Sequence, residues 1–291
     1  MITVSFHSYK GGSCRTSTCF NTLPFLARKL NASSVSPLLV IDADLESQGL
    51  TYLFRAEEDF RYHKLYDAKE LFSSKKMPKD FREACLPVGD KLGLEKESVY
   101  FLGVNDMKTF VAQNKGGQVD EALNELTDRG FCGIVYDTAS GDQFSAGATN
   151  KNSDVLVCCM RPTTQFTTGT FSFLDRISKE WITQGGMQVR RVIVLPTAVP
   201  REQTLIDGKD QHKAALEKIV GNCMDVNFEI NQAFMHQECF GIPEVARFKW
   251  CEDVLFRLDL EDMLISEQDA QLALTRYEKL ADTIIEEGEQ V

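Results

Sequence analysis

Residues 9–17 read Tyr-Lys-Gly-Gly-Ser-Cys-Arg-Thr-Ser, and they follow the apolar opening Ile-Thr-Val-Ser-Phe of residues 2–6. A short strand that leads into a glycine pair, with a hydroxyl pair opening the next helix, is the layout of a phosphate-binding loop. In such a loop, backbone N–H groups and the N-terminus of the following helix surround the phosphates. Gly11 and Gly12 allow this close approach, and Thr16 offers its hydroxyl to Mg²⁺. The sequence therefore predicts a phosphate site near its N-terminus.

Two further segments place acidic residues where apolar runs end. Residues 37–50 read Pro-Leu-Leu-Val-Ile-Asp-Ala-Asp-Leu-Glu-Ser-Gln-Gly-Leu, and period-2 alternation puts Asp42 and Asp44 on one side of the chain. Residues 131–142 read Phe-Cys-Gly-Ile-Val-Tyr-Asp-Thr-Ala-Ser-Gly-Asp, with Asp137 after the apolar run. Taken alone, the first pair of acids has a second interpretation, a polar strand end that caps a helix. Together, the segments predict carboxylates that face the phosphate site.

In this order and spacing, the segments resemble the ParA/MinD family of dimerising ATPases. Lys10 stands directly before the glycine pair, as in the deviant Walker A motif of that family, and Arg15 takes the place of the second lysine of the motif. The chain is thus similar to the branch with arginine at that position. The resemblance covers roughly residues 1–200. It implies a three-layer P-loop NTPase α/β fold, with a mostly parallel twisted sheet flanked by helices, and it implies binding of ATP or ADP with Mg²⁺.

The resemblance also assigns roles to individual residues. Lys10 is expected to cross a homodimer to the nucleotide of the partner, and Asp44 to orient the attacking water, so these two are the candidate catalytic residues. The expected Mg²⁺ ligands, direct or through water, are Thr16, Asp42 and Asp137. The candidate nucleotide-binding residues are Lys10, Gly11, Gly12, Ser13, Cys14, Arg15, Thr16, Ser17, Arg161, Pro196 and Pro200.

Three departures from the family pattern bear on the function. Arg15 is a planar fork rather than a compact point charge, although it can bind phosphate oxygens bidentately. Cys14 replaces a glycine, which costs roughly 1–2 kcal/mol if the loop needs a positive φ there. Pro196 and Thr197 stand where the family often has an asparagine near adenine, so backbone carbonyls of residues 195–200 are the expected base contacts.

These departures leave two functions open. The first is an ATP- and Mg²⁺-dependent dimerising molecular switch, with slow ATP hydrolysis, that acts through a protein partner. The alternative is a non-hydrolysing, nucleotide-bound subunit of a multiprotein assembly.

Apolar runs of strand length alternate with helical patterns, which is typical of βα units around a mostly parallel sheet. The expected strands are 2–7, 37–43, 99–104, 131–136, 154–160 and 191–196. The expected helices are 16–31, 118–129, 164–184, 203–220 and 267–287. We expect a single nucleotide-binding domain over residues 1–291, with a helical insertion at about 55–97 and an acidic C-terminal helix.

Charge and composition restrict the partners. The net charge is −11, and residues 252–291 hold 12 acidic and three basic residues, a balance of 3 − 12 = −9. Nucleic acid and anionic membranes are therefore disfavoured, and a protein partner is expected. No 18-residue apolar run and no secretory signal are visible, so a cytoplasmic location is expected. The nine cysteines form no C-x-x-C pair, which favours reduced thiols over a zinc-bridged or metal-cluster protein.

Overall fold

The computed structural model describes residues 1–110, 118–141, 143–184, 191–199, 229–235, 239–245 and 267–289. Eight strands form one sheet in the order β3-β4-β2-β5-β1-β6-β7-β8. The strands are β1 (Ile2–His7), β2 (Leu38–Ala43), β3 (Leu86–Pro87), β4 (Val99–Leu102), β5 (Gly133–Thr138), β6 (Val155–Met160), β7 (Arg191–Pro196) and β8 (Glu229–Asn231). All neighbouring pairs are parallel except β3 with β4.

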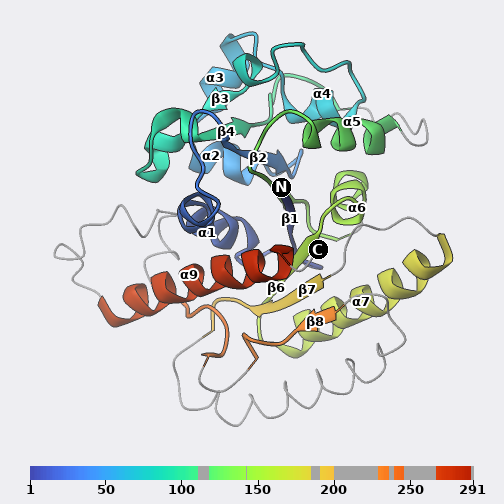
Figure 1. The fold of residues 1–291 in the computed structure, drawn as a ribbon. Coiled ribbons are helices and arrows are strands. Elements are labelled where there is room, and N and C mark those ends of the chain that lie inside the picture. The colour runs from blue at the N-terminus through green and yellow to red at the C-terminus, as the bar shows by residue number, and fades with distance from the viewer. Residues whose placement is uncertain are drawn as a thin grey trace.

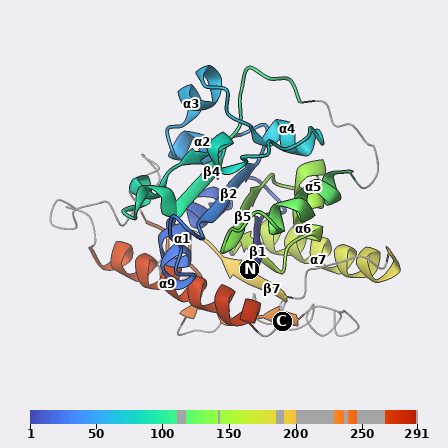
Figure 2. The ribbon, with the colours of Figure 1, turned by 45° about the horizontal axis from the view of Figure 1, so that its top comes forward.

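The main strands are continuous apolar runs because helices cover both faces of the sheet. On one face, α1 (Arg15–Lys29), α2 (Gly49–Leu53) and α9 (Glu267–Glu289) pack over alternate strand residues such as Leu38 and Val40. On the other face lie α4 (Ala68–Phe72), α5 (Gln118–Thr127), α6 (Phe144–Lys151) and α7 (Thr164–Gln184). Figures 1 and 2 show α1 and α9 side by side on their face. The result is a three-layer α/β fold.

Residues 55–97 connect β2 to β4 through short elements. They contain α3 (Glu57–Tyr62), α4, the edge strand β3 and three 3₁₀ turns. The side chain of Asp67 caps α4 and forms a capping box with Glu70. Phe60 and Phe72 are buried against the main sheet, so this segment shares the core of the domain.

The structure confirms the expected α/β class and its parallel sheet. All six expected strands are present, with ends shifted by at most two residues. Four of the five expected helices are present, and the one expected over 203–220 lies outside the described residues. Helices α2 and α6 and the edge strands β3 and β8 were not expected. None of the helices in the described ranges has the length and apolar character needed to cross a membrane.

Candidate functional site

The predicted site residues follow strands whose carboxyl ends meet at one edge of the sheet. Strand β1 leads into the loop 8–14, and β2 is followed by Asp44. The next strand along the sheet, β5, contains Asp137, which is in register with Asp42 of β2. Parallel strands bring their carboxyl ends together, and ligands of open α/β sheets bind outside these ends. The fold therefore gathers residues 8–17, 42–44 and 137 at one place.

The loop 8–14 surrounds a cavity of about 360 Å³. Gly12 has a φ of 83°, and Cys14, which precedes α1, has a φ of 53°. Both residues thus have a left-handed backbone conformation. Cys14 adopts a conformation that glycine would adopt more easily. The cavity is lined by Ser8, Gly11, Gly12, Ser13, Cys14, Arg15, Thr16, Ser17, Asp44, Ser47, Gly49, Tyr52 and Ser140.

Two residues that line this cavity carry hydroxyls without a protein partner. The hydroxyls of Ser8 and Ser13 are buried, and neither has a hydrogen-bond partner among the described residues. Helix α1 begins at Arg15 without a side-chain cap, and no acidic residue lies in its first turn. Its first N–H groups therefore stay available to an anion. Buried polar groups of this kind are expected to pair with a ligand or with water.

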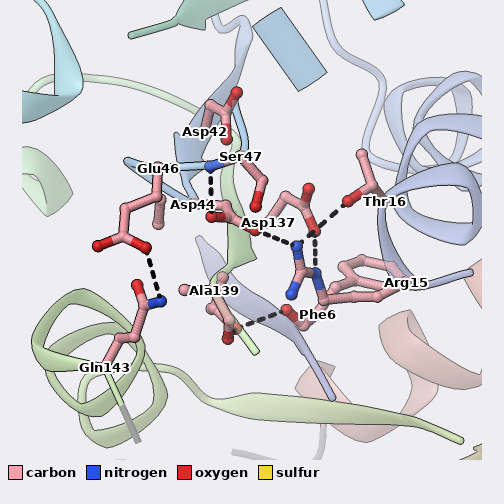
Figure 3. Close-up of polar contacts among 12 residues, drawn as sticks. Phe6, Arg15, Thr16, Asp42, Asp44, Glu46, Ser47, Asp137, Ala139 and Gln143 are labelled. Atoms are coloured by element: carbon pink, nitrogen blue, oxygen red, sulfur yellow. Dashed lines mark hydrogen bonds and ion pairs between the residues drawn. The ribbon is translucent and has the colours of Figure 1, made fainter. Parts of the chain in front are cut away.

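Arg15 does not lie free in the cavity, because its guanidinium joins two carboxylates (Figure 3). Its Nε donates to Asp137 Oδ1 at 2.7 Å, and its Nη2 donates to Asp44 Oδ2 at 2.8 Å. The same Nη2 lies 3.2 Å from Thr16 Oγ1. Arg15 is 8% exposed and Asp137 is fully buried. Arg15, a predicted phosphate ligand, thus contacts two predicted metal ligands, Thr16 and Asp137. It also contacts the predicted water-orienting carboxylate, Asp44.

Burial and the neighbouring charges shift the pKa values of the side chains in this cluster. Burial opposes the charge of Arg15, but Asp137 and Asp44 outweigh it and raise the arginine pKa. Burial raises the pKa of Asp137, while Arg15 acts in the opposite direction. Burial and the nearby charge of Asp137 raise the pKa of Asp42 to about 8. The guanidinium is therefore held in its charged form beside the carboxylates.

Several oxygens of the residues expected to hold Mg²⁺ are engaged by protein groups in this arrangement. Asp42 Oδ2 accepts two hydrogen bonds from Thr51, from its N–H at 2.9 Å and from its hydroxyl at 2.8 Å. Thr16 Oγ1 and Asp137 Oδ1 are engaged by Arg15. Two buried oxygens, Asp42 Oδ1 and Asp137 Oδ2, have no hydrogen-bond partner. In the described ranges, no three His, Cys, Asp or Glu side chains are arranged to hold a metal ion.

A second cavity, of about 100 Å³, adjoins the first and shares Cys14 and Ser17 with it. Arg161, which follows β6, lines this cavity. Pro196 does not line it, although its carbonyl oxygen accepts from the N–H of Ile242 at 2.8 Å. Pro200 lies outside the described residues. The other lining residues are Thr18, Ala198, Ile242, Pro243, Glu244, Val245 and Tyr277.

Thr197 contacts the phosphate loop from the end of β7. Its hydroxyl lies 2.5 Å from the carbonyl oxygen of Ser13 and 3.2 Å from that of Met160. The residue that follows β7 is therefore hydrogen-bonded to the phosphate loop. Thr197, which with Pro196 stands where the family often has an asparagine, thus makes a structural contact to Ser13.

Lys10 lies outside the cavity that the loop encloses. It is exposed, and its Nζ lies 5.9 Å from the ring centroid of Phe166 in α7. Lys10 is not among the lining residues of either cavity.

Several lining residues were missed by sequence reasoning. Ser47 and Gly49 lie in the quoted segment 37–50, so their position after the acids was the available signal. A Cβ on Gly49 would lie 2.8 Å from Thr16 Cγ2, which shows how closely α2 packs against the loop. Residues 242–245 carry no motif, and nothing in the sequence around Tyr277 marks it as a lining residue.

The comparisons with known proteins agree with this geometry. The sequence matches no family model and no curated protein. Solved structures share its fold at low identity. An ATP complex of a Cyanothece McdA variant is 17% identical, covers 98% of this chain and 96% of its own, and has a TM-score of 0.65. The pNOB8 ParA bound to nonspecific DNA is 17% identical, covers 99% of both chains and has a TM-score of 0.64.

A third structure extends the set to MinD. The Pyrococcus horikoshii septum site-determining protein MinD, in complex with Mg-ADP, is 15% identical, covers 97% of this chain and 95% of its own, and has a TM-score of 0.56. The structural neighbours of the chain are therefore MinD, McdA and ParA, and it has the fold of the ParA/MinD P-loop ATPases.

Proposed function

We propose that this chain is an ATP-binding molecular switch that dimerises in its ATP state and acts through a protein partner. The observation that supports nucleotide binding best is the pair of buried, unpartnered hydroxyls of Ser8 and Ser13, two residues that line the loop cavity. Together with the uncapped start of α1 and the charge of Arg15, they form a site built for an anion. Structural neighbours solved with Mg-ADP and with ATP support the same ligand class.

The two adjoining cavities fit the two ends of a nucleotide. The larger one has polar lining and takes phosphates, while the smaller one includes Tyr277, Ile242 and Val245 and takes a base. Ser17 and Cys14 lie between them. In this proposal Arg161 and the segment 242–245 contact the nucleoside, and Pro196 supports that segment from behind.

Dimerisation is proposed from the position of Lys10. Its own phosphate cavity is complete without it, and its ammonium group is exposed above α7. A cation in this place is available to the nucleotide of a second copy, where it would act as an arginine finger does. The strongly acidic charge favours a protein as the downstream partner over DNA or an anionic membrane.

One observation favours the second candidate function, a nucleotide-bound subunit that does not hydrolyse ATP. Both carboxylate oxygens of Asp44 are engaged, Oδ2 by Arg15 and Oδ1 by the N–H of Ser47 at 3.0 Å. Each oxygen keeps a second acceptor site, but these two contacts hold the Asp44 carboxylate in place and limit how it can turn toward an attacking water. Hydrolysis is therefore expected to be slow, and to be absent if Arg15 keeps Asp44 when ATP is bound.

Calorimetry with ADP and with a non-hydrolysable ATP analogue tests the proposal. We expect saturable binding at one nucleotide per chain. Gly11→Val should abolish it, because a Cβ on Gly11 has room beside Ser140, so the added methyl groups fill the cavity without breaking the fold. Gly147→Val, on the exposed side of α6, is the matched control and should bind as the wild type does. No binding at millimolar nucleotide would refute the proposal.

A further inference from the structure

The guanidinium of Arg15 lies among the residues that were expected to surround a divalent cation. It contacts Thr16 Oγ1, Asp137 Oδ1 and Asp44 Oδ2 within 3.2 Å. These contacts come from three separate segments: the start of α1, the strand β5 and the end of β2. A cation in this place neutralises carboxylates that would otherwise be buried without a counter-charge.

Arg15 lines the ligand cavity, whereas two of the buried acidic residues of the site do not. Asp42 and Asp137 are fully buried and do not line the 360 Å³ cavity, whereas Arg15 does. A phosphate in the cavity can thus contact Arg15 but neither of these two acidic side chains.

The guanidinium keeps hydrogen-bonding capacity for that phosphate. Arg15 uses Nε and Nη2 for its protein contacts, and Nη1 makes no hydrogen bond to the part of the chain that the structure describes. Guanidinium groups carry five N–H donors in a fixed fork, so one group can bind carboxylates on one side and a phosphate on another. Arg15 can therefore contact an anion without leaving Asp44 and Asp137.

We propose that Arg15 takes the place of the divalent cation, so that this site binds ATP or ADP without Mg²⁺. This inference rests on the proposed nucleotide site. It adds that the site binds the nucleotide without a bound metal ion. A guanidinium bridges the acidic residues and the phosphates with one positive charge. The nucleotide would then be bound equally well as the free anion.

Wild-type protein is tested first, by calorimetry with ADP in excess Mg²⁺ and again in EDTA. The two dissociation constants should agree to within about fivefold, a difference of less than about 1 kcal/mol. Weakening by more than about fivefold in EDTA would overturn the inference and leave the nucleotide site standing. Absence of binding in both buffers would instead overturn the proposed function, and the inference with it.

Variants at Arg15 test the residue itself. Arg15→Lys retains one positive charge but cannot contact Asp137, Asp44 and Thr16 together, so EDTA should weaken its ADP binding by about tenfold or more. Arg61→Lys, an exposed arginine paired with Asp106, is the matched control and should behave as the wild type does. An Arg15→Lys protein that binds ADP equally in both buffers would contradict the assignment.

If Arg15→Lys does not fold, thermal unfolding of the wild type with Mg²⁺ and without nucleotide tests the inference instead. The nucleotide-free wild type should unfold at the same temperature in millimolar Mg²⁺ and in EDTA, because Arg15 already engages Thr16 and Asp137. A clear upward shift with Mg²⁺, absent with the same concentration of a monovalent salt, would show a metal site in the wild type and would overturn the inference.

Discussion

At the scale of single residues, the buried carboxylates depend on Arg15 for their counter-charge. Asp137 is fully buried and Asp44 is nearly so, and Arg15 forms an ion pair with each. Buried ion pairs are seldom a large net source of stability, but removal of one partner leaves an uncompensated charge. Arg15 is thus expected to matter for the fold as well as for the ligand.

Arg15→Ala should lower the free energy of unfolding of the nucleotide-free protein by about 3–5 kcal/mol, the usual cost of breaking a buried pair. Urea denaturation at pH 7 measures this change. Addition of Asp44→Ala to Arg15→Ala should recover part of the loss, because one of the two uncompensated carboxylates is then gone. An unchanged unfolding midpoint in Arg15→Ala would show that the ion pairs do not stabilise the protein.

The buried Asp42 makes stability depend on pH. Its pKa is raised to about 8 by burial and by the charge of Asp137, whereas an unfolded chain titrates it near about 3.9. Between these values the folded state binds the extra proton, so its stability falls as the pH rises toward 8. Asp42→Asn has no charge to bury, and its amide oxygen can still accept from Thr51. Its gain in melting temperature over the wild type should therefore be larger at pH 8 than at pH 6.

Asp90→Asn is the control for this experiment, because Asp90 is exposed and far along the chain from the site. It should leave the melting temperature nearly unchanged at both pH values. A gain for Asp42→Asn that is equal at pH 6 and pH 8 would contradict a raised pKa at this residue.

At the scale of elements, the sequence predicted the sheet better than the connections. Strands such as β2 and β6 are continuous apolar runs, and burial on both faces accounts for that pattern. Helix α6 was missed because Phe144–Lys151 is short, contains Gly147 and lacks a long apolar periodicity. The conformation of Cys14 at positive φ was anticipated as a cost of replacing glycine, and the structure has it at 53°.

The site was predicted as a set of residues but not as a set of contacts. Sequence spacing placed Asp44 and Asp137 near the phosphate loop, since carboxyl ends of parallel strands meet at one edge. It could not show that Arg15 pairs with both, because 122 residues separate Arg15 from Asp137 and only the folded sheet brings them together. The contact between Thr51 and Asp42 was hidden for a similar reason.

Thr197 links strand β7 to the phosphate loop, and its hydroxyl can be removed without a change of shape. Thr197→Val should weaken nucleotide binding and lower stability by about 1–3 kcal/mol, because the buried carbonyl oxygen of Ser13 loses its donor. Hydrogen exchange of residues 8–14 should become faster in the same variant. Thr275→Val, on an exposed position of α9, is the matched control. Unchanged exchange in the loop would show that β7 does not hold it.

At the scale of the whole molecule, the net charge bears on the class of partner. The net charge of −11 disfavours DNA, yet one structural neighbour is a ParA bound to nonspecific DNA. We keep the protein partner as the proposal on the basis of charge. Fluorescence anisotropy with labelled duplex DNA, in the presence of the ATP analogue, is expected to show no binding at about 0.1 M salt, and salt-sensitive binding would contradict it.

The exposed position of Lys10 leads to a prediction about dimerisation. If it crosses to the nucleotide of a second copy, Lys10→Ala should remain monomeric in the ATP state, although it still binds nucleotide through its own cavity. Lys96→Ala replaces another exposed lysine, away from the loop, and should dimerise as the wild type does. Dimerisation of Lys10→Ala at the wild-type affinity would rule out the crossing role.

Light scattering of the wild-type chain, with and without a saturating non-hydrolysable ATP analogue, tests the switch most directly. The account predicts the mass of one chain without nucleotide or with ADP, and twice that mass with the analogue. A mass that is the same in all three conditions, while calorimetry shows that the nucleotides are bound, would contradict the claim that ATP switches this protein between a monomer and a dimer.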